Sequence, residues 1–448
     1  MRNWPEWAGF LFSVFGLFSH DVTNMEFFLS GLLQLDPWLW GGIGVPFVLG
    51  TGTYLSFRSR FIQIRFLSSG LFGLFAKDRT SVSSFFASVG GAVGIGNVIG
   101  VCSMLASVGP GAVLWFWIGA FFGILLKYAE VYLAVRFKGE QNGMVSYLCV
   151  AFQKHPYVPK LASLLSCVYG IEIYQFNVVR DSVSEAWGMP KLIVSLSLLF
   201  FVFLGVRGGF QRVGKVSSKI LPPLLLLYFF MSLCVLFVFR SHLANVFTEI
   251  LIGFFDPSSV APGLGASSLL AASQGLAKGC YATDIGTGYS GMIYSSSPRK
   301  EPFQMAKLVL LEPIFDAFGV CTLSLLLVLS TGVWREGLSS GFLVQASLGT
   351  VFPYSKQIVS VLLSLLGYST ITAFLATGIE SAKFLSPRKG ATLYGCLAAC
   401  LWVTFSFLDA EIAFLFMSFC GFGLLMINVL AFVRLRNHIQ FCHEHKGV

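Results

Sequence analysis

Two glycine clusters in the sequence have the spacing expected where a membrane helix unwinds. The first contains Gly94-Ile95-Gly96 followed by Asn97, and the second contains Gly286-Thr287-Gly288 preceded by Asp284. Glycine tolerates the backbone angles that unwinding requires. Inside a membrane, unwound backbone is tolerated only where it lines a cavity. Its free N–H groups suit a carboxylate and its free carbonyl groups suit a small cation. The clusters therefore predict a site for a small anion together with a cation.

The same glycines could also serve close helix packing or nucleotide binding. Glycines allow membrane helices to approach one another, and Gly286-x-Gly288-x-x-Gly291 matches the dinucleotide-binding fingerprint. No strand precedes this fingerprint and no βαβ unit follows it, which excludes nucleotide binding. The clusters lie in mid-span, five predicted spans apart, so their helices run in opposite directions. This placement favours a site within an inverted repeat over simple packing.

Hydroxyl and amide side chains lie in otherwise apolar stretches. Ser369 and Thr370 are adjacent, and such hydroxyls either bond to the carbonyl one turn earlier or face a hard cation such as sodium. Gln175 and Asn177 lie beside charged residues in another predicted span. Intramembrane amides often join helices, but this stripe could equally face a polar interior.

Charged residues within the predicted spans are few. Lys127 and Glu130 are one turn apart, which favours a local ion pair. Asp284 either contacts a substrate amine, pairs with Lys278, or caps the half-helix that begins near Gly286; we favour a cap and hinge role. Three further carboxylates are functional candidates by default because they lie within or beside spans: Glu312, Asp316 and Glu380. All 6 histidines fall outside the spans, which favours sodium over protons as the coupling ion.

The elements that must position these residues are membrane helices. The chain has 448 residues, of which 55% are hydrophobic and 11% charged, against about 25% charged in soluble proteins. This composition excludes water-soluble, fibrous and disordered classes, and the basic residues form short groups between apolar runs rather than a nucleic-acid surface. Because a span needs ~20 apolar residues and must satisfy its own backbone hydrogen bonds, the fold class is an all-α integral membrane protein of about eleven spans. The spans are predicted at 38–57, two within 80–126 divided at Gly109-Pro110-Gly111, about 161–184, 189–206, 220–239, 263–296, 303–332, 357–379, 390–408 and 412–433.

Positive charge predicts the orientation. Alternate loops assigned to the cytoplasm hold 22 of the 30 Lys and Arg residues and the outside segments hold six, and cytoplasmic loops carry such an excess. The N-terminus is then outside and the C-terminus inside. The predicted organisation has an N-terminal segment with an interfacial helix, an extra transmembrane helix, a basic cytoplasmic loop, two five-helix repeats and a cytoplasmic tail. These occupy 1–37 (the helix at 8–18), 38–57, 58–79, 80–240, 263–436 and 437–448.

The sequence resembles a known family, the alanine or glycine:cation symporters (sodium:alanine symporter family). The resemblance runs from about Trp40 to Val433. It rests on a set of short motifs spread along the chain. They are Gly94-Ile95-Gly96-Asn97, Gly109-Pro110-Gly111-Ala112-Val113-Leu114-Trp115-Phe116-Trp117, Lys127-Tyr128-Ala129-Glu130, Gln175-Phe176-Asn177, Arg212-Val213-Gly214-Lys215-Val216 and Gly275-Leu276-Ala277-Lys278-Gly279.

The resemblance implies a leucine-transporter-type core of five plus five helices after one extra helix. It also implies sodium-coupled, sometimes proton-coupled, import of alanine or glycine. The substrate-binding residues that it suggests lie around both glycine clusters: Ala92, Gly94, Ile95, Gly96, Gln175, Asn177, Tyr281, Thr283, Gly286 and Phe374. The implied sodium ligands are Gly90, Val93, Leu366, Ser369 and Thr370, and the coupling or hinge residues are Asn97, Asp284 and Gly288.

The chain departs from the family pattern around this site. It has Ile95 where the family usually has Thr, Tyr281-Ala282-Thr283-Asp284-Ile285-Gly286 where the family shows Phe-Ser-Asn-Glu-Ala-Gly, and Phe374 in place of a tryptophan. Sodium coupling is therefore better supported than the identity of the amino acid.

These features predict a symporter of the bacterial cell (inner) membrane with no cofactor beyond its coupling ion. Its partners would be a small amino-acid substrate and the lipid membrane, with no nucleic acid and no obligatory protein partner. A symporter of the same fold for another small solute is the alternative. A channel would need a repeated filter motif, and an intramembrane enzyme would need a nucleophile–base pair or a metal set; the sequence shows neither.

Overall fold

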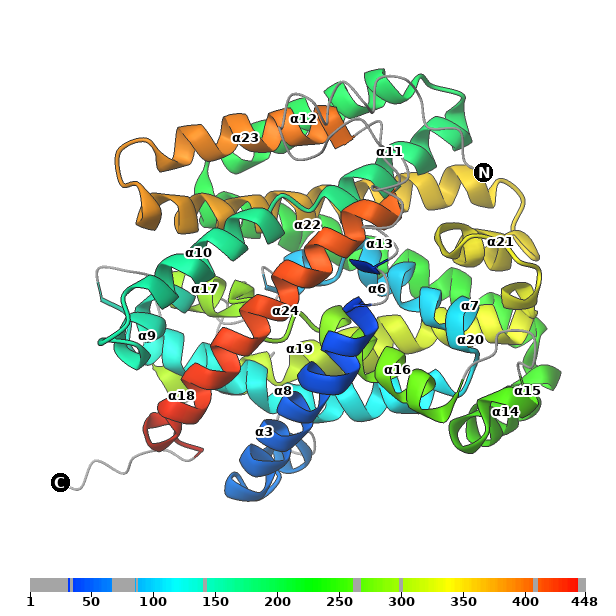
Figure 1. The fold of residues 1–448 in the computed structure, drawn as a ribbon. Coiled ribbons are helices and arrows are strands. Elements are labelled where there is room, and N and C mark those ends of the chain that lie inside the picture. The colour runs from blue at the N-terminus through cyan, green and yellow to red at the C-terminus, as the bar shows by residue number, and fades with distance from the viewer. Residues whose placement is uncertain are drawn as a thin grey trace.

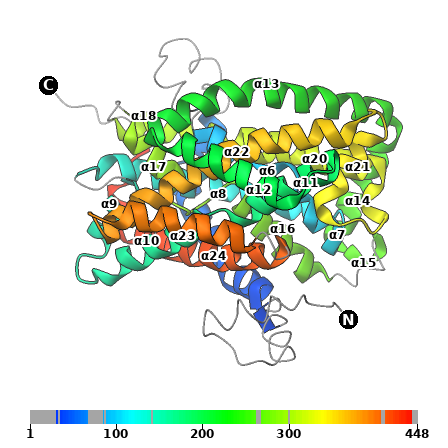
Figure 2. The same ribbon diagram turned by 90° about the horizontal axis from the view of Figure 1, so that it is seen from above.

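The computed structural model describes residues 31–32, 35–66, 85, 88–139, 143–260, 267–297, 301–405 and 410–441. Within these ranges the regular structure is helical, and no strand occurs. The long helices lie side by side along the molecule, with α24 crossing them on one face (Figures 1 and 2). The expected interfacial helix at 8–18, most of the basic loop after residue 66 and the end of the tail lie outside the described residues.

The first half of the chain forms the extra helix and the first group of helices. The extra helix begins as a π-helix, Leu39–Gly44, and continues as α3, Val45–Arg58. A helical stretch at 88–92 is followed by the short helices that complete the first glycine-containing span. The elements are α6 (Ile95–Val98), α7 (Ser103–Val108), α8 (Ala112–Arg136), α9 (Met144–Ala151), α10 (Tyr157–Tyr169), α11 (Ile173–Trp187), α12 (Lys191–Val206) and α13 (Gly209–Val238).

The second half of the chain also contains one broken helix. The helices α16 (Ser268–Ala282) and α17 (Tyr289–Ser296) are separated by the second glycine cluster. The other elements are α14 (Leu243–Phe255), α15 (Pro257–Val260), α18 (Pro302–Val309), α19 (Leu311–Pro313), the π-helix η5 (Ile314–Cys321), α20 (Thr322–Thr331), α21 (Leu343–Gly349), α22 (Ser355–Leu385), α23 (Gly390–Phe405) and α24 (Ala410–Arg434).

The structure corrects several predicted boundaries. Gly109 has φ 80°, and the turn that it opens separates α7 from α8 as expected, but α8 runs on to Arg136 rather than ending at 126. The span predicted at 161–184 is two helices, α10 and α11, because Glu172 adopts the left-handed conformation between them. Helix α14 forms where the sequence predicts only a loop. Its apolar pattern follows directly on the preceding apolar run, so the sequence alone does not separate the two.

Membrane-spanning helices are present among the described residues. Five are long and apolar enough to cross a bilayer: Ala112–Arg136, Arg212–Val238, Pro302–Thr331, Ser355–Leu385 and Leu415–Arg434. The apolar helices at Ile95–Val108, Lys191–Val206 and Gly390–Thr404 are shorter. Large apolar side chains such as Phe200, Phe230 and Phe237 point outward and are more than half exposed. Exposed apolar side chains of this kind suit lipid contact.

Candidate functional site

The first helix break brings an amide from another helix to its new N-terminus. Gly94 is extended, with φ −123° and ψ −162°, so the helix that ends at Ala92 restarts at Ile95. The Gly94 N–H donates to Asn97 Oδ1 at 3.0 Å. The Ile95 N–H donates to Gln175 Oε1 of α11 at 3.3 Å. Neutral groups thus satisfy the first donors of the half-helix α6, as orphan N–H groups at a helix start require.

An oxygen cluster lies at the other side of this break. Ser369 Oγ on α22 donates to the Gly90 carbonyl and lies 2.7 Å from Ser217 Oγ on α13. Thr370 Oγ1 is buried and has no hydrogen-bond partner among the residues that the structure describes. A buried hydroxyl without a partner is costly. This one lies beside Gly94, where a Cβ would be 2.6 Å from Thr370 Oγ1. Small hard cations prefer oxygen ligands, so the residues present fit a sodium ion as transported cargo.

The other expected sodium ligands flank this cluster. Val93 is completely buried, and its N–H continues the preceding helix by donating to Val89 O at 2.7 Å. Leu366 is buried one turn before Thr370 on α22. The carbonyl groups of these two residues are the predicted ligands.

Gly94 is too closely surrounded to carry a side chain. A Cβ there would lie 2.6 Å from Thr370 Oγ1 and 2.7 Å from Gln175 Oε1. We expect Gly94→Ala to lower substrate or sodium affinity about tenfold or more, because overpacking costs roughly 1–3 kcal/mol. Equilibrium binding to the purified variant measures this. Gly100→Ala is the matched control, since its Cβ would meet only Tyr174 Oη at 3.7 Å; equal losses in both variants would contradict the steric explanation.

Asn97 joins the two breaks. Its Nδ2 donates to the Ala282 carbonyl at 2.6 Å and also to Asp316 Oδ1 on η5. All three groups are buried. Ala282 is the last residue of α16, so the amide ties the start of α6 to the end of the first half of the second broken helix. A single side chain thus contacts both breaks.

The second break is built from left-handed residues. Asp284, Gly286 and Gly288 have φ values of 49°, 73° and 84°. Asn428 Nδ2 on α24 donates to the Gly286 carbonyl at 2.8 Å, and Thr287 Oγ1 donates to the Asp284 carbonyl at 3.1 Å. These two carbonyl groups are therefore satisfied inside the protein, as membrane depth requires.

The cap of the second half-helix differs from the sequence interpretation. Glu130 on α8, rather than Asp284, receives the N–H groups at the start of α17, from Gly288 at 3.3 Å and from Gly291 at 2.9 Å. Asp284 instead lies in the unwound turn with φ 49°, and its carbonyl accepts a hydrogen bond from Thr287 Oγ1. Gly288, four residues later, occupies the N-cap position of α17, so Asp284 stands outside it.

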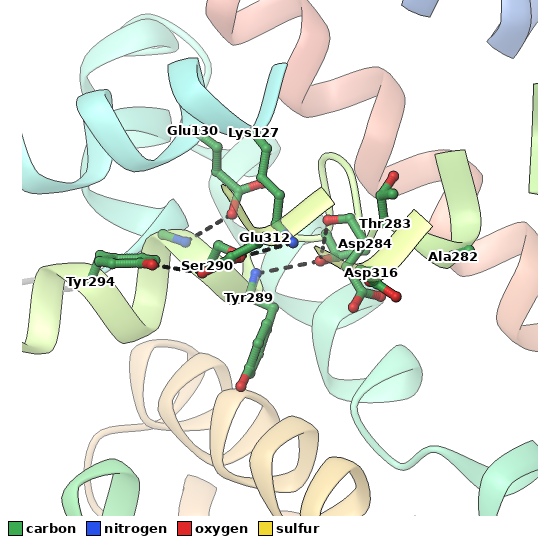
Figure 3. Close-up of polar contacts among 12 residues, drawn as sticks. Lys127, Glu130, Ala282, Thr283, Asp284, Tyr289, Ser290, Tyr294, Glu312 and Asp316 are labelled. Carbon is green, nitrogen blue, oxygen red and sulfur yellow. Dashed lines mark hydrogen bonds and ion pairs between the residues drawn. The ribbon is translucent and has the colours of Figure 1, made fainter. Parts of the chain in front are cut away.

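Lys127 also has a different partner from the one expected. Its Nζ lies 3.1 Å from Glu312 Oε2, and both side chains are buried. Glu312 further accepts hydrogen bonds from Ser290 Oγ at 3.1 Å and Tyr294 Oη at 2.7 Å (Figure 3). The predicted local pair of Lys127 with Glu130 is wrong because both side chains leave α8 toward separate elements across the break.

Aromatic side chains lie close to both breaks. Phe374 is buried and stacks on Tyr289 at a centroid distance of 4.7 Å, and it meets Tyr169 edge-on at 5.6 Å. Tyr281 approaches the first break, because a Cβ on Gly96 would lie 3.7 Å from its ring. These rings and the buried Ala92 and Ile95 make this side of the site largely apolar.

The structure brings together most, but not all, of the expected residues through direct contacts. Gln175 contacts the first break, whereas Asn177 accepts a hydrogen bond from Arg180 Nη1 at 3.1 Å. Thr283 turns back to donate to the Gly279 carbonyl at 2.7 Å. Sequence reasoning missed Ser217, Asn428 and Tyr289. A buried hydroxyl in the motif around Gly214 and an amide in the last span were the available signals.

Comparison with known proteins adds the family. The chain matches the model of the sodium:alanine symporter family over residues 25–444. It is 27% identical to the sodium/alanine symporter AgcS of Methanococcus maripaludis, covering 82% of this chain and 86% of that protein. It is 26% identical to the probable sodium/glutamine symporter GlnT of Bacillus subtilis, covering 78% of this chain and 76% of that protein.

The fold has solved counterparts. The crystal structure of MhsT in complex with L-phenylalanine matches with a TM-score of 0.60 and 13% identity, covering 81% of this chain and 90% of that chain. This likeness supports the leucine-transporter-type fold class, and the family identifies a multi-pass membrane transporter rather than an enzyme. The helix breaks, the oxygen cluster and the match along nearly the whole sequence agree: the chain belongs to the sodium:alanine symporter family.

Proposed function

We propose that this protein is a secondary symporter that uses a sodium gradient to import a small neutral amino acid such as alanine or glycine. The observation that carries the proposal is the Thr370 hydroxyl, which is buried beside Gly94 with no hydrogen-bond partner among the described residues. Ser369, the preceding residue, donates its hydroxyl to the Gly90 carbonyl of the same break. Sodium would lie among these oxygens, with the carbonyl groups of Val93 and Leu366 completing its ligands. The family to which the chain belongs supports sodium coupling.

The amino acid would bind between the two breaks. Its carboxylate would face the start of α6, where Gly94, Ile95 and Gly96 present backbone N–H groups and Gln175 already lies close. Gly96 leaves room beside Tyr281, since a Cβ there would make only an ordinary contact at 3.7 Å. The apolar wall of Phe374 favours a short uncharged side chain. Thr283, Asn177 and Gly286 would lie further around the substrate, and Asn97, Asp284 and Gly288 would move with it.

The proposed organisation is an inverted repeat of five plus five helices, at 80–240 and 263–436, after the extra helix at 38–57. The broken helices on either side of Asn97 would be corresponding members of the two repeats. Rocking of one group of helices against the other would open the site alternately to each side of the membrane. The protein would lie in the bacterial inner membrane.

Ligand binding tests the proposed substrate class directly. A ligand that binds the folded protein raises its melting temperature. We expect alanine or glycine to raise the melting temperature of the purified protein in sodium chloride but not in choline chloride. Glutamine is included because of the relative GlnT. If glutamine alone stabilises the protein, the substrate is a larger amino acid than we propose. If none of these amino acids stabilises the protein in sodium chloride, the proposal is wrong.

Orientation is tested by fused reporters. With the N-terminus outside, a periplasm-dependent reporter enzyme fused after Phe255 should be active and the same reporter after Arg436 should be inactive. The reason is the excess of Lys and Arg in the loops assigned to the cytoplasm. Activity ratios at the two positions are the measurement. The reverse ratio would invert the topology, and equal activity at both positions would contradict the predicted spans.

A further inference from the structure

The start of α17 is capped by a carboxylate from another helix. Glu130 on α8 accepts the Gly291 N–H through Oε1 at 2.9 Å and the Gly288 N–H through Oε2 at 3.3 Å. Glu130 is completely buried, and the residue before α17 is Gly288, which has no side chain to serve as a cap. Figure 3 shows Glu130 reaching from α8 to this backbone.

The chemistry of this position explains why a carboxylate stands there. α17 begins inside the protein, where its first N–H groups cannot reach water. The helix dipole also places partial positive charge at this end. An anion accepts hydrogen bonds from these N–H groups and also interacts favourably with the partial positive charge. Helix starts bind carboxylate and phosphate groups for the same two reasons.

Two glycines of the second cluster, Gly288 and Gly291, lie close to the Glu130 side chain. A Cβ on Gly291 would lie 3.3 Å from Glu130 Cγ and Oε1 and 3.1 Å from Ala134 Cβ. Gly288 adopts φ 84°, which turns its N–H toward α8. A larger residue at position 291 would push the Glu130 carboxylate away. Glycine at this position therefore leaves room for the Glu130 side chain.

A second carboxylate holds the same half-helix by its side chains. Glu312 accepts hydrogen bonds from Ser290 Oγ and Tyr294 Oη and pairs with Lys127. α17 is thus held by Glu130 at its backbone and by Glu312 at its side chains. Lys127 and Glu130 are one turn apart on α8, so one helix organises both contacts.

The first break differs from the second in the charge of its partners. Asn97 Oδ1 and Gln175 Oε1, both neutral, receive the N–H groups of Gly94 and Ile95. The contact from Gln175 is long, at 3.3 Å. A carboxylate at this break would therefore meet donors whose present acceptors are neutral.

We propose that Glu130 is an internal surrogate anion that permanently occupies the anion-binding end of the second broken helix. It positions α17 and leaves the first break as the place for a substrate carboxylate. The assignment of the first break to the substrate rests on the proposed function. Glu130 is therefore a positioning residue, and the Lys127-Tyr128-Ala129-Glu130 motif supplies the anion that the second break requires.

Chemical rescue tests the proposal. Glu130→Ala removes the carboxylate and leaves space for a small one. We expect this variant to lose about tenfold or more of its alanine uptake rate in proteoliposomes, by the size of a charged hydrogen bond. Sodium formate in place of sodium chloride, at equal ionic strength, should restore uptake several-fold. Formate should leave the parent protein unchanged, and it should not rescue Ser369→Ala, whose defect lies elsewhere.

Melting temperature separates failure of this proposal from failure of the proposed function. Formate should raise the melting temperature of purified Glu130→Ala relative to chloride, whatever the transported substrate is. If Glu130→Ala does not fold, Glu130→Gln supplies the test: it keeps the size and one acceptor oxygen, and should fold but transport several-fold more slowly. Unaltered transport by Glu130→Gln, or a folded Glu130→Ala that formate neither rescues nor stabilises, overturns the proposal.

Discussion

Replacing Lys127 with alanine should destabilise the folded protein by about 3–5 kcal/mol, the usual cost of removing one partner of a buried ion pair. Lys127 Nζ lies 3.1 Å from Glu312 Oε2, and the two side chains are 0% and 1% exposed. The variant would leave the Glu312 carboxylate buried with, among the described residues, the Ser290 and Tyr294 hydroxyls as its hydrogen-bond partners. Thermal denaturation of the purified variant in detergent, together with its folded yield, measures the loss.

A second substitution should recover much of this stability. In Lys127→Met/Glu312→Gln both charges are gone and the volume is nearly kept, so no uncompensated charge remains. Lys383→Ala is the matched control, because Lys383 pairs with Glu380 at 2.6 Å but is 49% exposed. Exposed pairs contribute less than about 1 kcal/mol. A Lys127→Ala variant as stable as Lys383→Ala would show that the buried pair does not hold α8 to α19.

Removing the hydroxyls of Ser369 and Thr370 should raise the half-saturating sodium concentration for uptake by about tenfold or more. Each substitution to Ala deletes one oxygen from the cluster at the first break, and a bond to a charged group contributes roughly 1.5–3 kcal/mol. The half-saturating concentration of the amino-acid substrate, measured at saturating sodium, should change less. The sodium dependence of initial uptake rates gives both quantities.

Position 370 offers a closer comparison. Thr370→Ser keeps the oxygen and loses only a methyl group, so it should retain sodium dependence, whereas the nearly isosteric Thr370→Val should not. Thr372→Val is the control on the same helix, because Thr372 Oγ1 already donates to Tyr368 O at 2.6 Å and Ser369 O at 2.9 Å. If Thr370→Val and Thr372→Val behave alike, Thr370 is not a sodium ligand.

The helix breaks could be predicted from sequence because they depend on local backbone chemistry. Gly288 adopts a left-handed conformation that glycine favours, and the structure breaks both helices where the clusters lie. The division of α10 from α11 could not be predicted in this way. It depends on Glu172, whose left-handed backbone at φ 53° is uncommon for a residue with a side chain.

The interaction partners of the buried charged residues could not be predicted from the sequence. Spacing along α8 favoured a pair of Lys127 with Glu130, because residues one turn apart are neighbours on an isolated helix. In the folded protein each finds a stronger partner across the break, Glu312 for one and the α17 N-terminus for the other. Similarly, the sequence indicated Ser369 and Thr370, but not Ser217, because tertiary packing alone brings α13 to that cluster.

Accumulation of radiolabelled alanine in proteoliposomes tests the central claim most directly. With sodium outside and choline inside, we expect the internal alanine concentration to rise transiently above the external one, and to return to equilibrium when a sodium ionophore dissipates the gradient. Replacing external sodium by choline should abolish the overshoot even when a proton gradient is imposed. Alanine accumulation that is unchanged in choline, or that a proton gradient alone drives, would contradict sodium coupling at the Ser369 and Thr370 cluster.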